Sequence, residues 1–266
     1  MITLTLQETP SVPLEAETLS PDVVAGLTND QIRALPVYLG KRLRRVDDFF
    51  SVEGEASEEL EIHGDASRVK WIGRGMTRGR VTIQGSAGMH LGAYMKGGAI
   101  EVAGDASDWL GAEMSGGFIR VRGSAGGQVG AAYRGSLSGM TDGTIIVDGS
   151  AGLEVGMRMK RGTIILGKPV RDFAGLQMKG GTIVLCGGAE FRTGAWMNRG
   201  TIISLTAIPL LPTFAYASTY CPTFLKLYAR YLSPFGLALP DGNYQRYTGD
   251  AAVPGKGEIL IWSGAA

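Results

Sequence analysis

Cysteine and histidine are scarce in this sequence, which holds only Cys186, Cys221, His63 and His90 among 266 residues. Two cysteines cannot form a disulfide framework, and so few thiols and imidazoles exclude a zinc or iron–sulfur site of the clustered-thiolate kind. The low cysteine content fits a reducing compartment. The N-terminus also lacks a basic stretch followed by an apolar one, so we expect a cytoplasmic protein.

Long apolar runs and an excess charge of one sign are absent as well. No uninterrupted apolar run approaches the ~20 residues of a membrane helix, so we expect no membrane partner. Lys and Arg number 26 against 25 Asp and Glu, a formal net charge of +1. That balance gives no general affinity for nucleic acid, and we expect none as a partner.

Glycine is the residue in excess, with 41 copies, about twice the usual ~7% share. No Gly-X-Y period accompanies it, which excludes collagen. The glycines instead recur every 19 residues, with one step of 26. The recurring positions are Gly73, Gly92, Gly111, Gly130, Gly156, Gly175 and Gly194. We assign the longer step to a seven-residue insertion within 136–143.

Other residue types follow the same period. Three positions after the glycines stand Met76, Met95, Met114, Tyr133, Met159, Met178 and Met197. An aliphatic column contains Val81, Ile100, Ile119, Ile145, Ile164, Ile183 and Ile202, and a second one lies two residues further on. Short alternating stretches between turn residues indicate strands, and no unit has room for a ten-residue helix.

These units predict an all-β fold, a right-handed parallel β-helix of about seven 19-residue GxxGxxxG coils. A phosphate-binding loop would need its glycine-rich turn once, before a helix, whereas here the turn recurs and a strand follows it. We therefore interpret the glycines as corners. The expected divisions are an N-terminal arm (1–48), the repeat domain (49–205) and a C-terminal cap and tail (206–266).

Both ends depart from the period. We expect a strand at 2–6, two short helical turns with Ser20 and Thr28 or Asn29 as candidate N-caps, and a basic cluster at Lys41, Arg42, Arg44 and Arg45. That cluster is either a solvated strand face or a docking patch for an acidic partner. The tail has a helical apolar stripe over 222–232 and a strand at 259–262, and we interpret it as a helical cap.

One outward column changes character along the chain. It contains Thr82, Glu101 and Arg120, and then Ile146, Ile165, Val184 and Ile203. An apolar stripe of four stacked strands must be covered, either by the tail or by another subunit, and we favour the tail. Tyr94 and Trp196, which we expect to point outward elsewhere, are candidates for partner contact.

No constellation for catalysis stands out, and we assign no catalytic, cofactor-binding or metal residue. We expect His63 and His90 to be surface or corner residues without partners. Acids such as Asp65, Asp105, Asp108, Asp148 and Glu154 are scattered over turns. A partial basic column, Arg78, Arg134, Arg161 and Arg199, could line an anion path. A stand-alone polysaccharide-cleaving β-helix would need a focused carboxylate pair, and this alternative stays open.

The motif Gly-Ser-Ala-Gly-x3-Gly at 85–92, 123–130 and 149–156 resembles the C-terminal β-helix of the glutamate synthase large subunit. It is more similar to the C-subunit family of formylmethanofuran dehydrogenase, which shares the Phe-Phe-Ser-Val-Glu-Gly entry at 49–54. The resemblance covers residues 37–205. Ser67 and Ser107 replace the second glycine in two coils, and Lys168–Ala174 departs from the pattern.

The tail at 211–236 most resembles the C subunit of the bacterial formyltransferase/hydrolase complex. The resemblance implies a scaffold subunit of a hetero-oligomer that passes a formyl group from tetrahydromethanopterin to methanofuran and hydrolyses it to formate. It implies that the formyltransferase and metal-dependent hydrolase subunits carry methanofuran, tetrahydromethanopterin and a divalent metal such as zinc. A subunit of a CO2-reducing formylmethanofuran dehydrogenase, or a relay domain like that of glutamate synthase, are the alternatives.

Overall fold

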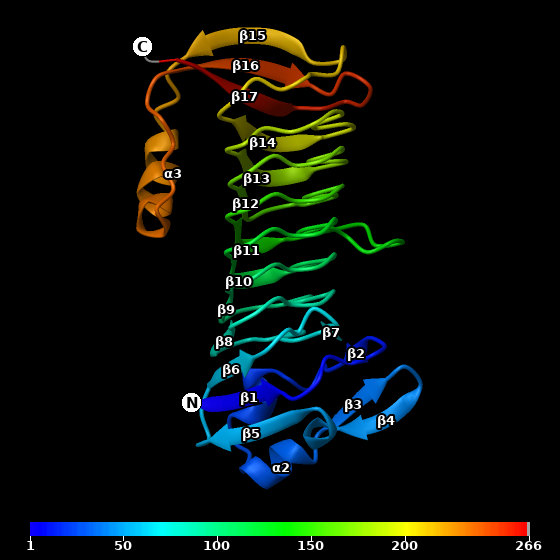
Figure 1. The fold of residues 1–266 in the computed structure, drawn as a ribbon. Helices are drawn as coiled ribbons and strands as arrows, with labels where there is room; N and C mark the ends of the chain where they lie inside the picture. The colour runs from blue at the N-terminus through cyan, green and yellow to red at the C-terminus, as the bar shows by residue number, and fades with distance from the viewer. Residues whose placement is uncertain (265–266) are drawn as a thin grey trace.

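The computed structural model describes residues 1–264, and it is mostly β with one long, largely parallel sheet of 13 strands. The repeat region supplies a strand to this sheet from each coil, as we term one repeat unit, and the coils lie stacked along one axis (Figure 1). The repeat strands are β6 (Glu59–His63), β8 (Arg80–Ile83), β9 (Ala99–Val102), β10 (Ser115–Val121), β11 (Asp142–Val147), β12 (Thr163–Leu166), β13 (Lys179–Leu185) and β14 (Arg199–Ser204).

Neighbouring repeat strands are parallel and in the register that the columns predict. Val81 pairs with Ile100, Ile100 with Ile119, and, across the insertion, Ile119 with Ile145. A second line of isolated parallel bridges joins the small residues of successive coils, from Ala66 to Ala125 and from Ala151 to Ala189. Successive coils therefore meet along two lines of parallel contacts, the second of which is interrupted between Ala125 and Ala151.

The corner glycines are required both for their backbone conformation and for space. Gly156 has φ +66°, in the left-handed region that favours glycine, and a Cβ there would lie 2.6 Å from the Cδ1 of Ile183. Gly152, in the adjoining turn, has no such φ, but a Cβ on it would lie 2.6 Å from the backbone nitrogen of Gly127. One column therefore needs glycine for conformation and core packing, and the other for close approach of backbones.

The methionine column is complete, but one of its predicted members is wrong. Met140, and not Tyr133, occupies it in the fourth coil: Met140 is fully buried, and its N–H donates to the carbonyl of Gly130, as that of Met159 does to Gly156. The seven inserted residues are therefore 133–139 rather than a stretch within 136–143. The insertion leaves Tyr133 half-buried and outside the core.

The N-terminal arm closes one end of the stack. Strand β1 (Ile2–Leu6) pairs in parallel with β6 and antiparallel with β5 (Phe50–Gly54). Helix α2 (Asn29–Arg33), whose N-cap Thr28 forms a capping box with Gln31, covers the outer edge of β5. The Arg33 guanidinium donates to the carbonyl of Val52 at 2.8 Å, and the Asn29 amide to that of Gly54 at 3.0 Å.

A second, four-stranded sheet joins the arm to the first coil. It contains β2 (Leu14–Glu15), β3 (Pro36–Leu39), β4 (Arg42–Arg45) and β7 (Val69–Lys70). Helix α1 (Pro21–Val24) and the 3-10 turn η1 (Val46–Asp48) complete the arm. Ser20 lies at the N-cap of α1, but its side chain makes no capping hydrogen bond.

The other end is closed by strands, so the predicted helical cap is only partly right. Strand β17 (Gly257–Gly264) pairs in parallel with β14, β16 (Asn243–Gly249) pairs antiparallel with β17, and β15 (Ala215–Tyr220) forms the outer edge. The tail helix α3 (Leu225–Leu232), followed by η2 (Ser233–Phe235), lies along the side of the stack instead (Figure 1). No helix among residues 1–264 is long and apolar enough to cross a membrane.

Helix α3 covers the apolar outward stripe, as we expected of the tail. Ile146, Ile165, Val184 and Ile203 are all fully buried, in a core separate from the interior of the coils. The tail supplies the other side of that core through Leu225, Leu232, Leu239, Tyr244 and Leu260. Two tyrosines fix the helix to the strands: the hydroxyls of Tyr228 and Tyr231 each lie 2.7 Å from a threonine hydroxyl, of Thr182 and Thr144.

Candidate functional site

The most distinctive surface follows the corner of the coils where the backbone turns left-handed. Two columns of residues flank the corner glycines, one lying two residues before each glycine and the other two residues after it. Nearly all of these residues are not glycine, although their backbone φ is positive. The first column contains Trp71, His90, Trp109, Gln128, Glu154, Phe173 and Arg192, with φ between 56° and 68°. The second contains Gly75, Tyr94, Glu113, Arg158, Gln177 and Trp196, with φ between 52° and 65°. Because non-glycine residues rarely adopt this conformation, the two columns, which we call the corner edge, are a defined feature of the surface.

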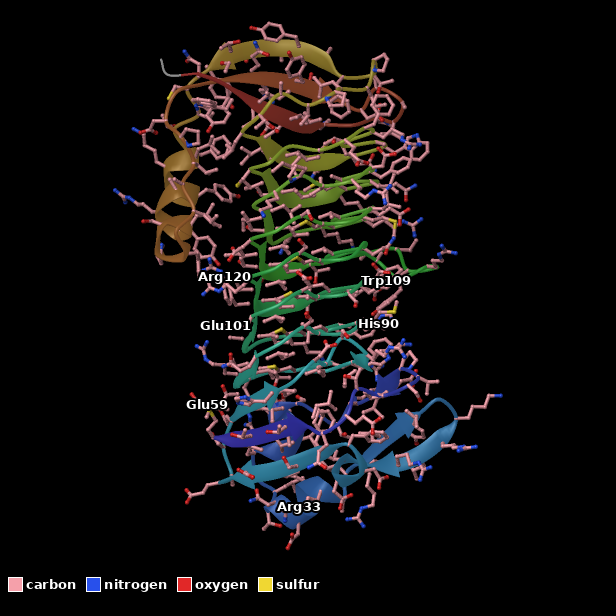
Figure 2. All side chains as sticks on the ribbon, in the orientation of Figure 1. Arg33, Glu59, His90, Glu101, Trp109 and Arg120 are labelled. Atoms are coloured by element: carbon pink, nitrogen blue, oxygen red, sulfur yellow. The ribbon has the colours of Figure 1, made fainter. Side chains whose placement is uncertain are left out.

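The first coils of the corner edge carry an aromatic cluster of Trp71, His90, Trp109, Tyr133 and Tyr94. The His90 ring stacks on Trp71 with centroids 4.1 Å apart and lies 6.4 Å from Trp109. Tyr133 stacks on Trp109 at 4.8 Å, and its hydroxyl lies 2.8 Å from Nδ1 of His90. Figure 2 shows His90 and Trp109 on the opposite side of the stack from Glu101 and Arg120.

The expectation that His90 has no partner is therefore wrong. Burial, reinforced by the charge of Lys70, lowers the pKa of His90 to about 4, against an opposing effect of Asp108. Burial also raises the pKa of Tyr133, with Tyr94 and Glu113 adding to it. Near pH 7 both groups are therefore neutral, and the contact between them is a hydrogen bond between neutral partners.

The same expectation is wrong for His63, which lies on β6 and is paired with a carboxylate. Its Nε2 is 3.2 Å from Oε2 of Glu61. Hydrogen bonds from Gln84 and His63 lower the pKa of the Glu61 carboxyl. The pair is partly exposed, with 43% of the His63 side chain accessible. The structure does not bring the two histidines together in one site, because His63 lies in the main sheet and His90 at the corner edge.

The scattered acids fasten one coil to the next. Oδ1 of Asp105 accepts from the N–H of Ser124 at 2.7 Å, and Oδ1 of Asp108 accepts from that of Gly127 at 2.7 Å. Asp65 acts within its own turn on Ser67. Carboxylates in these positions satisfy turn N–H groups. Among residues 1–264 no group of three or more His, Cys, Asp or Glu side chains is arranged to hold a metal ion.

Asp148 and Glu154 have other partners. The Asp148 carboxylate accepts hydrogen bonds from two nitrogens of the Arg120 guanidinium, at 3.1 and 3.2 Å. Arg120 also donates to the carbonyl of Phe235 in the tail, at 2.9 Å. Only 9% of Arg120 is exposed. Glu154 accepts from the amide of Gln128 at 2.9 Å within the corner edge. The tail therefore reaches beyond the apolar stripe to the last polar member of the outward column.

The two basic groups that the sequence singles out differ in their surroundings. All four residues of the Lys41–Arg45 cluster are exposed on or beside β4, and Arg45 pairs with Asp47 at 2.9 Å. In the predicted basic column, Arg78 pairs with Glu58 at 3.2 Å and Arg134 lies in the insertion. Arg161 and Arg199 share the column of Arg78 and are exposed. The predicted contact residues differ too: Trp196 is 48% exposed, whereas Tyr94 is half-buried in the aromatic cluster.

Comparisons with known proteins agree with the repeat pattern. The family model described as the GXGXG motif matches residues 58–207. The C subunit of a molybdenum-containing formylmethanofuran dehydrogenase from Methanothermobacter marburgensis is 45% identical over 83 residues, 30% of this chain and 21% of that protein. The C subunit of a tungsten-containing formylmethanofuran dehydrogenase from Methanothermobacter thermautotrophicus is 39% identical over 97 residues, 35% of this chain and 36% of that protein. The matched segments thus span about a fifth to a third of these relatives.

A solved structure matches over nearly the whole chain. It is a chain of the formyltransferase/hydrolase complex (FhcABCD) from Methylorubrum extorquens, determined with methylofuran. The two chains are 31% identical with a TM-score of 0.92, and the match covers 98% of this chain and 100% of the other. The arm and the tail, and not only the coils, are therefore similar in that chain.

Proposed function

The chain belongs to the GXGXG motif family and, within it, to the C-subunit family of formylmethanofuran dehydrogenase, and from this premise we propose that it is a scaffold subunit without catalytic residues of its own. Its parent complex would transfer a formyl group from tetrahydromethanopterin to methanofuran and hydrolyse it to formate, a step of formaldehyde oxidation. The full-length similarity to a chain of the formyltransferase/hydrolase complex is the observation that carries this proposal.

The partners in this proposal are the formyltransferase and metal-dependent hydrolase subunits, in the cytoplasm. Methanofuran, tetrahydromethanopterin and a divalent metal such as zinc would be bound by them. Within this chain, the titratable groups that drew attention have structural partners: His90 with Tyr133, Asp105 and Asp108 with turn N–H groups, and Asp148 with Arg120. These contacts support a role in holding partners rather than in chemistry.

A second candidate function is a place in a CO2-reducing formylmethanofuran dehydrogenase. The local identity to the C subunit of the molybdenum enzyme, 45% over 83 residues, favours it. The match to the formyltransferase/hydrolase chain extends over the tail helix and the strands that close the stack, which makes the hydrolytic complex the first choice.

The same proposal includes the architecture. We infer that the coils wind as a right-handed parallel β-helix, because crossovers between parallel strands nearly always have that hand. The parallel registers on two sides of each coil support it. The division into an arm (1–48), repeat domain (49–205) and tail (206–266) is proposed with it.

Purification from the native host tests the function. A tagged full-length chain should copurify with a formyltransferase and a metal-dependent hydrolase, and the complex should release formate from a formyl donor. The isolated chain should be inactive. Hydrolysis of the donor by the isolated chain would refute the scaffold assignment. Copurification with a molybdenum or tungsten subunit and iron–sulfur proteins would select the second candidate.

A further inference from the structure

We propose that a line of six cations on the last coils is a docking surface for an extended acidic segment of a partner subunit, an inference that rests on the proposed function. These cations, which we call the basic strip, are Arg158, Lys160, Arg161, Lys179, Arg199 and Lys256. Four of them are exposed and two, Arg158 and Lys179, are half-buried. They include two members of the basic column noted in the sequence.

The repeat puts the members of the strip next to one another. The residue after each core methionine is hydrogen-bonded to the preceding coil. The N–H of Lys160 donates to the carbonyl of Met140, and the N–H of Lys179 donates to the carbonyl of Met159. Asn198 continues the line, and its carbonyl accepts from the N–H of Lys256 at 2.7 Å. Arg199 is in register with Lys179. Successive coils are about 4.8 Å apart. The strip crosses three of them and ends at Lys256, directly before β17.

The charges of the strip are not neutralised within the described chain. No member has a carboxylate within 4.0 Å among residues 1–264, whereas Arg74, Arg78, Arg80 and Arg120 in the earlier coils each have one. Where strip residues are held, the acceptors are neutral. Arg158 donates to the side chain of Gln177 at 2.7 Å, and Lys179 donates to the carbonyl of Leu137 at 2.6 Å.

The distribution of charge along the sequence explains this. Residues 151–266 hold 12 Lys and Arg against 6 Asp and Glu, a net +6, whereas residues 1–150 hold 14 against 19, a net −5. Five of those six acids have partners that lie outside the strip. They are Asp172 with Arg192, Glu190 with Arg171, Glu258 with Arg246, Glu154 with Gln128, and Asp250 with backbone N–H groups. The overall net charge of +1 is therefore the sum of an acidic N-terminal part and a basic C-terminal part of the chain.

A hollow beside the strip supplies apolar contact. It has a volume of about 430 Å³ and lies between the insertion and the second column of the corner edge. Arg158 and Lys179 line it together with Leu137 and Trp196, whose exposed fractions are 73% and 48%. Aromatic side chains and arginine are enriched at protein interfaces, and an exposed tryptophan next to unpaired cations has that composition.

The arrangement favours an acidic polypeptide over a phosphate. A phosphate group is bound by donors that converge on one point, such as helix N-termini or backbone nests. Here the cations are single charges strung along three coils, which matches successive carboxylates on an extended chain. A long nucleic acid would run from the strip onto the half of the chain with net charge −5, where it would be repelled.

A matched pair of charge reversals tests the surface on the full-length chain. Lys160→Glu/Lys179→Glu removes the centre of the strip, and Arg42→Glu/Arg44→Glu makes the same change in the exposed cluster on β4. The probe is a fluorescein-labelled peptide of ten glutamates interrupted by two leucines, followed by anisotropy. We expect the strip reversal to weaken binding about tenfold and the β4 reversal to change it less than about twofold.

Three results would overturn the inference. They are equal loss in both variants, no binding by the wild-type chain, or tighter strip-dependent binding of a labelled oligothymidylate of the same charge. Lys160→Gln/Lys179→Gln, with circular dichroism and elution volume unchanged, separates loss of charge from misfolding.

Crosslinking in the assembled complex separates this inference from the proposed function. A photoreactive residue in place of Leu137 should crosslink to an acidic segment of a partner subunit, and the crosslink should disappear with Lys160→Glu/Lys179→Glu. If the complex assembles without such a crosslink, the docking inference fails and the proposed function stands. If the chain copurifies with no partner, the proposed function fails, and the peptide titration alone decides whether the strip binds acidic chains.

Discussion

Two glycine-to-alanine changes with the same backbone conformation separate the two reasons for glycine at the corners. Gly156 and Gly75 have φ +66° and +65°. A Cβ at Gly75 would meet nothing within 4 Å, whereas one at Gly156 would lie 2.6 Å from the Cδ1 and 3.5 Å from the Cγ1 of Ile183, which is fully buried. The pair therefore differs in packing and not in backbone strain.

The expected costs follow from that difference. Alanine in the left-handed region costs about 1 kcal/mol at either position. Gly156→Ala adds an overpacking cost of about 1–3 kcal/mol, because the buried isoleucine cannot move without displacing the neighbouring ladder. We expect Gly75→Ala to lose about 1 kcal/mol and Gly156→Ala about 2–4 kcal/mol. Tyr94, Arg158 and Trp196 occupy the column of Gly75 in other coils, which agrees with the smaller cost there.

Thermal unfolding followed by far-ultraviolet circular dichroism measures both variants. For a chain of this size, 1 kcal/mol corresponds to a change of about 2–4 °C in the midpoint. Equal midpoints for the two variants would refute the assignment of Gly156 to a packing role, and a loss above about 3 kcal/mol in Gly75→Ala would refute the assumed backbone cost.

Three further predictions concern other parts of the fold. The pKa of His90 is about 4 in the folded protein, below the ordinary value of 6.5, so the unfolded chain takes up the proton first as pH falls. The contribution of His90 to the free energy of unfolding is therefore full above pH 6.5 and declines toward pH 4 by about 1–2 kcal/mol, after allowance for solvent screening. In a His90→Gln variant the urea unfolding midpoint should depend less steeply on pH over that range, and equal pH dependence in the two proteins would contradict this. Ile165→Ala, in the core under α3, should cost about 2–5 kcal/mol in urea unfolding, whereas Thr82→Ala in the same column should stay within about 0.5 kcal/mol. Met140→Ala should lower the thermal midpoint as much as Met159→Ala; a loss confined to Met159 would restore Tyr133 to the core column.

The spacing of residues in the sequence predicted the coils, because a 19-residue period brings equivalent positions of successive coils next to one another. It failed at the insertion because Gly130 plus three residues and Gly130 plus ten both give a large side chain, Tyr133 and Met140. The full burial of Met140 and its hydrogen bond to Gly130 distinguish them, and both are properties of the structure. The aromatic cluster did leave a signal, since Trp71, His90 and Trp109 are 19 residues apart, but Tyr133 joins it only once the insertion is placed correctly.

The apolar stripe shows which features of the tail the sequence pattern could predict and which it could not. Four stacked isoleucine and valine residues on an outward column require a cover, and the tail helix with its tyrosines supplies it. The direction of the helix, along the side rather than across the end, could not be predicted, because it depends on hydroxyl contacts such as Tyr228 with Thr182. The strands that close the end pair through backbone groups, which carry little sequence signal.

The way in which the two ends are closed gives the stack a fixed length. At one end α2 side chains occupy carbonyls of β5, and at the other the chain reverses direction into β16 and β15. In the long sheet, the arm pairs only with β6 and the tail only with β14, so these strand pairings do not depend on how many coils lie between. A 19-residue unit duplicated or deleted at β9, which the tail does not cover, would change the distance between the ends by one step of about 4.8 Å and leave the contacts of both ends intact. The number of repeats therefore sets the distance between the arm and the tail, and that distance can change only in whole steps.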